Sequence, residues 1–380
     1  MTERDRQAVT VVPGLELPSE RIVVPDELEA PANRSWPERV AYGVVGLAMF
    51  VAALGLMKEG ATSLIPTLEG SIFTDNPWST LGLGWLGSCL VLSGSPIAAS
   101  ALALLDGGAI DRTQAFTMLT GSRLGASFVV LVVGVIYSLR NQGQGQKRAP
   151  VSIGILSLMM TAVIYLPGAA IGFFLLQRGT FDGLDIGTSP GLTSATDAAF
   201  GWMVDAVTSV APDWTLFPIG LVLLVAGFNC FDRLLPAISS DEIGTREVGW
   251  SSRMWPMFLA GCAVTSLTLS VSVSLTLLVP LVAKGHVRRS NTLPYIAGAN
   301  ITTLVDTLVA AILIGNQDAV RVVAAVTSVV TVLTVLVLLT SYPLLRRGML
   351  AVARYVLASN QRLAGFAAVL FLVPMALIAV

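Results

Sequence analysis

Long apolar runs separated by short polar breaks dominate this chain from about residue 40 onward. Seven of the runs are predicted to cross a bilayer as helices, for which about 20 mostly apolar residues are needed. They cover 40–57, 113–139, 151–176, 216–231, 293–315, 322–339 and 363–380. The runs are continuously apolar, whereas the strands of a membrane barrel alternate polar and apolar residues. The pattern therefore predicts an all-α polytopic membrane protein.

Two further apolar runs, 81–105 and 256–283, carry polar residues at their centres. The first is interrupted by SGSP at 93–96, and the second carries hydroxyls between Ser270 and Thr276. Proline removes a backbone donor and Gly-Ser weakens a helix, so we expect two half-helices that meet at a turn. Hydroxyls at membrane depth persist only where protein or water meets them. Each run is therefore predicted to be a re-entrant hairpin that carries part of a binding site.

The two interrupted runs correspond to each other at a shift of 177 positions without gaps. Residues 90–100 then fall on 267–277. The same shift places three glycines on glycines, namely Gly84 on Gly261, Gly108 on Gly285 and Gly121 on Gly298. We interpret the chain as two copies of one unit, which is how many secondary transporters are built. If the hairpins do not cross the membrane, the two copies run in opposite directions and are inverted-topology repeats.

Shifts in composition divide the chain into five parts. Residues 1–37 are polar and rich in Pro and Glu, and we expect a disordered cytoplasmic tail. Transmembrane repeats are expected at 38–177 and 215–345, and 178–214 is predicted to be an acidic extracytoplasmic linker. Residues 346–380 contain a basic amphipathic segment, which should lie along a membrane surface, and then the terminal span.

Composition and charge agree with a membrane protein and predict its orientation. The chain is 54% hydrophobic and 12% charged, with a mean hydropathy of +0.76, unlike a soluble domain. With a cytoplasmic N-terminus, 18 of the 23 Lys and Arg lie on the inner side, as the positive-inside rule predicts. We expect a multi-pass protein of the cell (plasma) membrane with the lipid bilayer as its partner. The net charge of −1 gives no sign of a nucleic-acid partner, and the oligomeric state stays open.

The sequence disfavours metal centres and enzymatic catalysis. Its three cysteines all lie in apolar runs, as small buried residues do, and its one histidine, His286, excludes a multi-histidine metal centre. An enzyme would need a nucleophile with a base, and His286 with the intramembrane serines is the only such combination. His286 lies in a basic loop, and no GxSxG motif accompanies the serines. We therefore expect no catalytic residues.

Several stretches resemble the type II sodium/phosphate cotransporters. NPWSTLGLGWLGSCLVLSGSPIAAS (76–100) resembles the run into the QSSS signature of that family. VSVSLTLLVPLVAKGHVRRSNTLPYIAGANITT (271–303) resembles the second copy with the following GANIGTT-like segment, and 46–64 and 353–378 also fit the family's pattern. The resemblance covers nearly everything from about residue 40 onward. It implies an inverted-repeat transporter with substrate and sodium held between the two hairpins.

The chain departs from the family's motifs at positions that would bind the substrate. The QSSS positions fall on 92–95 and 269–272, so leucine replaces both glutamines. A leucine side chain offers neither a donor nor a lone pair, and phosphate or sodium affinity should fall unless something compensates. Arg123 stands where the first GANIG-like segment would carry asparagine. A guanidinium at this position would clamp an oxyanion but repel sodium.

The polar pattern and the resemblance together define the candidate substrate- and ion-binding residues. They are Ser93, Ser95, Arg123, Ser127, Ser270, Ser272, Ser274, Asn300, Thr302, Thr303 and Asp306. Sodium, the coupling ion that the resemblance implies, would be bound by Ser270, Ser272, Asn300 and Thr302. Two other interpretations stay open here. The serines would instead bond back to helix carbonyls and pack helices closely, and Arg123 with Asp306 would instead form a buried ion pair that joins the halves.

These observations lead us to expect a secondary active transporter. It would carry inorganic phosphate or a related small oxyanion by sodium-coupled symport and alternating access. One alternative is a divergent sodium/anion transporter for a substrate other than phosphate. The other is a non-transporting membrane receptor or scaffold, which would explain the loss of both glutamines.

Overall fold

The computed structural model describes residues 35–68, 70–140, 149–184, 190–234, 253–283 and 287–380. All regular secondary structure in these ranges is helical, and seven segments are long and apolar enough to cross a membrane. They are Trp36–Leu68, Arg112–Leu139, Ala149–Gln177, Asp213–Phe231, Arg289–Ile314, Gln317–Thr340 and Asn360–Ile378. Each contains or overlaps one predicted run, so the prediction of an all-α protein with seven such helical segments is confirmed.

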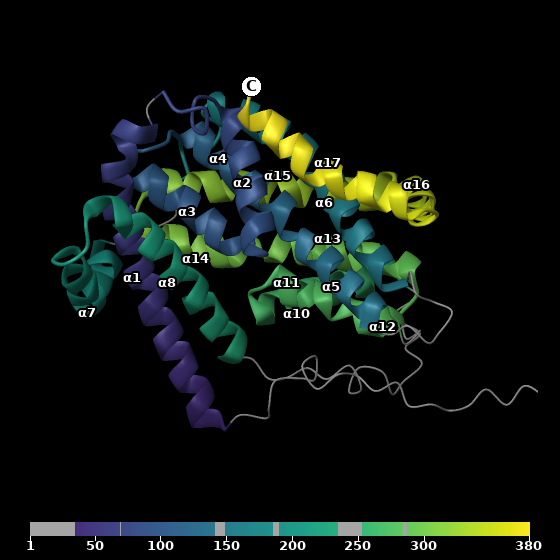
Figure 1. Ribbon diagram of the computed structural model, residues 1–380, viewed down its shortest axis with the longest axis horizontal. Coiled ribbons are helices and arrows are strands. Elements are labelled where there is room, and N and C mark those ends of the chain that lie inside the picture. The colour runs from purple at the N-terminus through teal and green to yellow at the C-terminus, as the bar shows by residue number, and fades with distance from the viewer. Residues whose placement is uncertain (1–34, 69, 141–148, 185–189, 235–252, 284–286) are drawn as a thin grey trace, which may run out of the picture.

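Helices α1 (Trp36–Leu68) and α8 (Asp213–Leu234) pack side by side along their lengths (Figure 1). Their first residues are 177 positions apart. The prediction that the first span ends at residue 57 was wrong, because the helix continues through Lys58 and Glu59. Both of these residues are exposed, so the helix continues past them without burying a charge.

The first interrupted run forms α2 (Pro77–Val91) and α3 (Ser95–Asp106). The side chain of Asn76 caps α2 by accepting hydrogen bonds from the backbone N–H of Trp78 and Ser79, at 2.8 and 3.0 Å. The helix ends because Leu92 adopts a left-handed conformation with φ of 57°. The chain therefore breaks at the predicted SGSP sequence.

The second interrupted run forms α10 (Met254–Thr268), α11 (Val271–Thr276) and α12 (Leu278–Ala283). Helix α10 has the same length as α2, 15 residues. It also ends in a left-handed leucine, Leu269, with φ of 49°. Within the described residues, Leu92 and Leu269 are the two positions other than glycine with positive φ. The turn that follows each helix thus recurs at the predicted interval.

The glycines that correspond at this interval make the same helix contacts. Helix α2 packs on α4 (Arg112–Ala126), and α10 packs on α13 (Thr292–Thr302). A Cβ atom on each of the four glycines would lie 2.1 or 2.2 Å from a carbonyl oxygen of the facing helix. These contacts are Gly84 with Met118, Gly121 with Leu81, Gly261 with Tyr295 and Gly298 with Phe258. Only glycine permits the two backbones to approach this closely.

Two of the predicted full spans are broken near their middles. The run 113–139 divides into α4 and α5 (Phe128–Arg140) at Ser127. The run 293–315 divides at Thr303 into α13 and α14 (Leu304–Ile314), after a short 3-10 helix, η2 (Arg289–Asn291). Both residues at the breaks are buried. Ser127 is hydrogen-bonded to a residue of α6, and Thr303 is hydrogen-bonded to a residue of α4. The breaks thus place polar side chains in the interior, around α6 (Ala149–Gln177).

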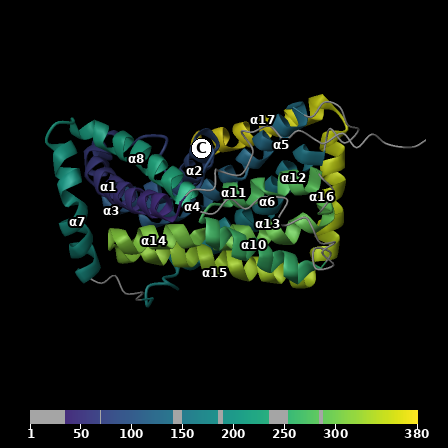
Figure 2. The same cartoon turned by 90° about the horizontal axis from the view of Figure 1, so that it is seen from below.

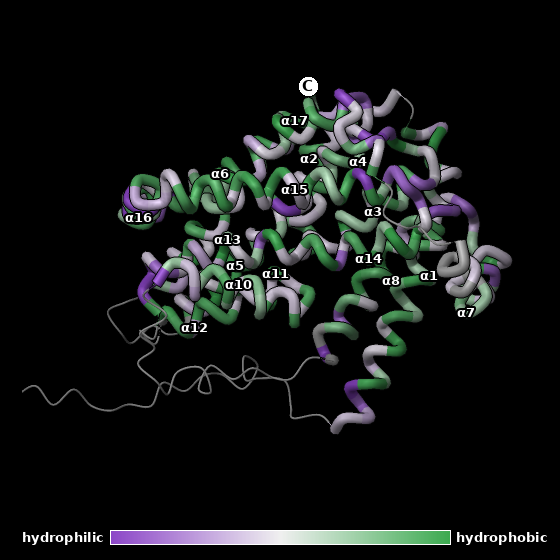
Figure 3. The backbone as a smooth tube through the Cα atoms, turned by 180° about the vertical axis from the view of Figure 1, so that it is seen from behind, coloured by the Kyte–Doolittle hydropathy of each residue, from purple (hydrophilic) through white to green (hydrophobic). Residues whose placement is uncertain are grey.

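Two helices cross the ends of the molecule. Helix α7 (Pro190–Thr208) and helix α16 (Tyr342–Leu357) lie at opposite ends and run across the direction of α14 and α15 (Gln317–Thr340), as Figure 2 shows. The predicted linker therefore contains a helix. Helix α16 buries Met349 and Val356 and exposes its arginines, so it is amphipathic as predicted. It is followed by α17 (Asn360–Ile378), and Figure 3 shows hydrophilic residues on α16 and long hydrophobic stretches on several other helices.

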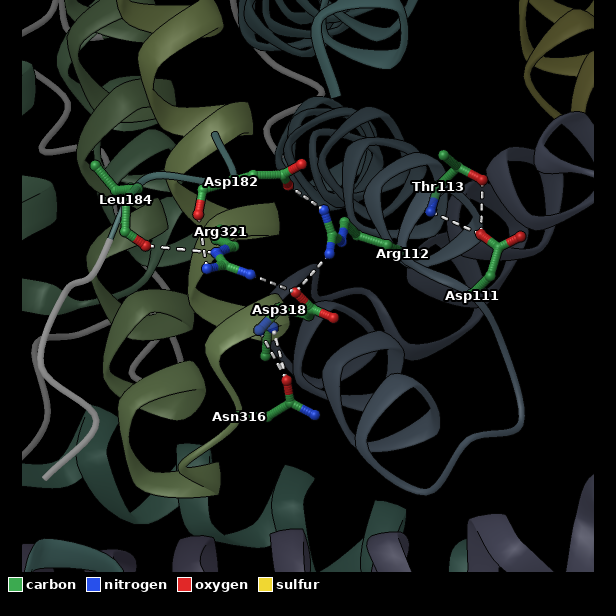
Figure 4. Close-up of polar contacts among 9 residues, drawn as sticks. Asp111, Arg112, Thr113, Asp182, Leu184, Asn316, Asp318 and Arg321 are labelled. Carbon is green, nitrogen blue, oxygen red and sulfur yellow. Dashed lines mark hydrogen bonds and ion pairs between the residues drawn. The ribbon is translucent and has the colours of Figure 1, made fainter. Parts of the chain in front are cut away.

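A charged cluster joins three segments at the start of α4 and α15 (Figure 4). Arg112 forms ion pairs with Asp182, at 2.5 Å, and with Asp318, at 2.8 Å. Arg321 pairs with Asp318 at 3.1 Å and donates to the carbonyl oxygen of Asp182 at 2.7 Å. The cluster ties the first half of the chain to the second and to residues of the predicted linker.

Some predictions concern parts of the chain outside the described residues. These are the tail up to residue 34, the polar loop at 141–148, the connection at 235–252, and Lys284, Gly285 and His286.

Candidate functional site

The two serine motifs meet at one cavity of about 240 Å³. The first motif contributes Ser93 and Ser95, and the second contributes Ser270 and Ser272. Helix α8 contributes Val225, Phe228 and Asn229 to the lining, and the remaining lining residues are Val91, Leu92, Pro96, Leu269 and Val273. The fold thus brings together hydroxyls that the sequence separates by 177 positions.

The start of α3 forms one wall of this cavity. Its N-cap is Gly94, which supplies no capping side chain, so the backbone N–H groups of Ser95 and Ile97 have no side-chain partner there, and Pro96 between them carries no N–H. Ser95 is 7% exposed, and its side chain has no hydrogen-bond partner among the described residues. Free donors at a helix start attract anions, because the helix dipole also favours negative charge there.

The second motif touches the first directly. Ser270 caps α11 by accepting a hydrogen bond from the Val273 N–H at 3.3 Å. The Ser272 hydroxyl donates to the carbonyl oxygen of Leu92, at a long 3.5 Å. Because this bond joins the two turns, a change in their separation would break it.

Sequence reasoning missed the contribution of α8 to the cavity. Asn229 is the only amide among the described lining residues, and none of these residues is charged. An asparagine inside an apolar run was the available signal, because an amide at membrane depth needs a partner. Its distance from both serine motifs in the sequence hid the connection.

Arg123 does not line the serine cavity but lies in a buried ion pair with Asp306. The Arg123 Nη2 atom is 3.5 Å from Asp306 Oδ1, and the two side chains are 2% and 4% exposed. Arg123 also donates from Nη1 to the Thr303 hydroxyl at 3.0 Å and from Nη2 to the Thr307 hydroxyl. Thr307 in turn donates to Asp306 Oδ1 at 2.8 Å. The structure therefore has the ion pair that the sequence analysis left open as an alternative.

Ser127 and Asn300 meet on α6. The Thr161 hydroxyl is 2.8 Å from the Ser127 hydroxyl and accepts a hydrogen bond from Asn300 Nδ2 at 2.9 Å. The Tyr165 hydroxyl donates to the backbone carbonyl of Asn300 at 2.7 Å. Sequence reasoning missed Thr161 and Tyr165, although two hydroxyls four positions apart on an apolar helix share one face.

The four residues expected to bind sodium are divided between different surroundings. Ser270 and Ser272 line the serine cavity, whereas Asn300 and Thr302 do not. The Asn300 amide donates to Thr161, and the Thr302 hydroxyl donates to the Gly298 carbonyl of its own helix at 3.2 Å. The hydrogen bond of Thr302 thus goes to a carbonyl of its own helix, the kind of bond that the sequence analysis considered for the serines alone.

Ser274 lies outside the lining of the cavity, in a buried hydroxyl cluster. Its hydroxyl accepts from Thr265 at 2.7 Å and is 3.0 Å from the Tyr295 hydroxyl. Ser274 therefore connects α11 to α10 and α13. In the part of the chain that the structure describes, no group of three or more His, Cys, Asp or Glu side chains is placed to hold a metal ion.

Comparisons of the chain with protein-family models, with curated proteins and with solved structures found no match. What the fold defines is a helical protein with seven segments suited to spanning a membrane.

Proposed function

We propose that this protein is a secondary active transporter whose substrate site is the serine cavity. The observation that carries the proposal is the meeting of Ser93 and Ser95 with Ser270 and Ser272 around one cavity. Transporters built from repeated units bind their substrates where interrupted helices of the two units meet. Residues from the ends of α2 and α10 line the cavity, which supports this proposal, and the motif resemblance implies the same class of protein.

Inverted-topology repeats are part of this proposal. Helices α2 and α10 start 177 positions apart, end in the same left-handed leucine and pack through corresponding glycines. In the proposed arrangement, α2–α3 and α10–α12 are re-entrant hairpins that enter from opposite membrane faces. Their turns then face each other near the middle of the bilayer, where a solute between them is reached alternately from each side.

The lining of the cavity favours a small oxyanion. Hydroxyl groups and the uncapped start of α3 donate hydrogen bonds to an anion such as phosphate. No described lining residue carries a positive charge, so a co-bound cation would have to offset the charge of the anion. Sodium-coupled symport of inorganic phosphate or a related oxyanion meets this need. The membrane potential would supply about 2.3 kcal/mol per charge per 100 mV.

Uptake by the purified protein in liposomes tests this function. With an inward sodium gradient, we expect flux of at least one of phosphate, arsenate and sulfate, and no such flux with choline in place of sodium. Ser95→Ala and Ser272→Ala should reduce the flux roughly 10- to 100-fold, because each removes a hydrogen bond to a charged solute worth about 1.5–3 kcal/mol.

The matched control is Ser266→Ala. Ser266 lies on α10 near the second motif, but its side chain is exposed and outside the cavity. Its flux should equal that of the unchanged protein. Flux of arsenate or sulfate without phosphate would indicate a divergent anion transporter. No flux of any oxyanion would contradict the proposal in favour of a receptor or scaffold, and unchanged flux in both serine variants would place the site elsewhere.

A further inference from the structure

Arg123 and Asp306 form a charged centre inside the helical bundle. They are the two charged residues that the described part of the chain buries almost completely, at 2% and 6% exposure of the whole residue. A charge inside a membrane protein is costly, so such residues are paired and mark functional positions. The proposed substrate cavity does not include either residue, so this centre needs a role of its own.

Three oxygen atoms converge on the Arg123 guanidinium. They belong to the Asp306 carboxylate, the Thr303 hydroxyl at 3.0 Å and the Thr307 hydroxyl. All three come from the break between α13 and α14 or from the first turn of α14. One carboxylate with two hydroxyls is a set of hard oxygen ligands, the kind that binds hard metal cations.

The centre has unused hydrogen-bonding capacity. Asp306 Oδ2 and Arg123 Nε are both buried and have no hydrogen-bond partner. Asp306 Oδ2 is thus a further oxygen that a cation at this place would find. The oxygen atoms at this place therefore include one, Asp306 Oδ2, that forms no hydrogen bond with the guanidinium.

The two charges arise at positions where the corresponding residue of the other half is neutral. At the interval of 177, Arg123 corresponds to Asn300 and Asp306 corresponds to Val129. Each half of the chain thus contributes one charge that the other half lacks. The guanidinium of Arg123 on α4 faces the carboxylate of Asp306 on α14. If either residue were removed, the other would be left as a buried charge without a partner.

We propose that Asp306, Thr303 and Thr307 form a site for a monovalent cation that Arg123 fills as a built-in cation. The guanidinium supplies the positive charge that a sodium ion would otherwise bring, and it repels a free cation from this place. This inference goes beyond the proposed transport function, because it states that any sodium ion that drives transport binds elsewhere. The carboxylate and hydroxyls need a cation for stability, and the chain provides it.

Thermal unfolding of Arg123→Ala in detergent tests this inference. Removing the guanidinium exposes the oxygen set to solution ions, so NaCl should raise the melting temperature above that in equimolar choline chloride. We expect this difference to exceed that of the unchanged protein by about 2–4 °C. Arg123→Lys keeps a positive charge and should show no additional difference.

A double variant separates cation binding from other effects of sodium. Arg123→Ala with Asp306→Asn lacks both charges and should show no additional sodium effect. If Arg123→Ala alone does not fold in choline chloride, its folded yield should recover in NaCl. An Arg123→Ala protein that responds equally to both salts, or that fails to fold in either while the double variant folds, would overturn the inference. Transport is not measured, so the result is independent of the flux experiments.

Discussion

Individual hydroxyl residues in this protein have roles set by their nearest partner rather than by their place in a motif. Ser95 and Ser272 face a cavity, whereas Ser274, only two positions after Ser272, is held by Thr265 and Tyr295. Thr161 belongs to no predicted motif, yet it joins Ser127 of the first half to Asn300 of the second. A buried polar group without a partner is destabilising, so this junction contributes to the stability of the bundle.

Replacement of Thr161 by valine should destabilise the protein by about 1–3 kcal/mol. The change keeps the shape but leaves the Asn300 amide and the Ser127 hydroxyl without their partner. Unfolding by titration with a denaturing detergent measures the loss. Thr327→Val is the matched control, because that hydroxyl donates only to the Val323 carbonyl of its own helix. A Thr327→Val protein as unstable as Thr161→Val would contradict the role of the junction.

Pairs of helices set the geometry that positions the cavity. The contact of α2 with α4, and of α10 with α13, depends on glycines that leave no room for a side chain. The left-handed turns at Leu92 and Leu269 follow directly from the ends of α2 and α10. A shift of either helix would therefore move one serine motif away from the other.

Gly84→Ala and Gly261→Ala should each destabilise the protein by about 1–3 kcal/mol or more. The added methyl group would lie 2.1 Å from a backbone carbonyl oxygen, so the facing helix would have to move. Gly201→Ala in α7 is the control, since nothing lies within 4 Å of its added Cβ. Alanine favours helix over glycine by about 0.5–1 kcal/mol, so the control should be stabilised. Melting temperatures in detergent check both signs, and a stabilised Gly84→Ala protein would refute the packing role.

At the scale of the whole molecule, ion pairs among the described residues join the two halves of the chain at two places with different exposure. Arg123 meets Asp306 in the interior, whereas Arg112 meets Asp318 at one end, with side chains 30% and 39% exposed. Salt screens exposed charges much more than buried ones. The two connections should therefore respond differently to ionic strength.

A double-mutant cycle measures this difference. For Arg112→Gln and Asp318→Asn, we expect a coupling energy of about 0.2–1 kcal/mol at low salt, because exposed pairs are weak. The coupling energy should fall toward zero in 1 M salt, where the Debye length is only about 3 Å and exposed charges are strongly screened. A cycle for Arg123→Gln and Asp306→Asn should keep its coupling in both conditions. Equal salt sensitivity of the two cycles would contradict the assigned burial.

The sequence by itself determined the features that depend on local chemistry. Apolar runs long enough to span a bilayer and their interruption by SGSP are properties of neighbouring residues, whereas the interval of 177 is visible when the sequence is aligned with itself. The structure has the predicted helices, and the chain breaks between α2, which ends at Val91, and α3, which begins at Ser95. Glycine positions were equally informative, because a missing side chain permits close packing wherever the facing helix lies.

Only the tertiary structure decided which polar side chains meet. Arg123 and Asp306 are 183 positions apart and do not correspond at the interval of 177, so the sequence offered their ion pair only as an alternative to a binding role, and the structure places the two side chains together. Asn229 and Thr161 became visible as site and junction residues only when α8 and α6 were placed against the two halves. The break at Ser127 was missed as well, since an apolar run does not reveal an interior hydrogen bond to another helix. Such contacts depend on how helices pack across long sequence separations, which local composition does not encode.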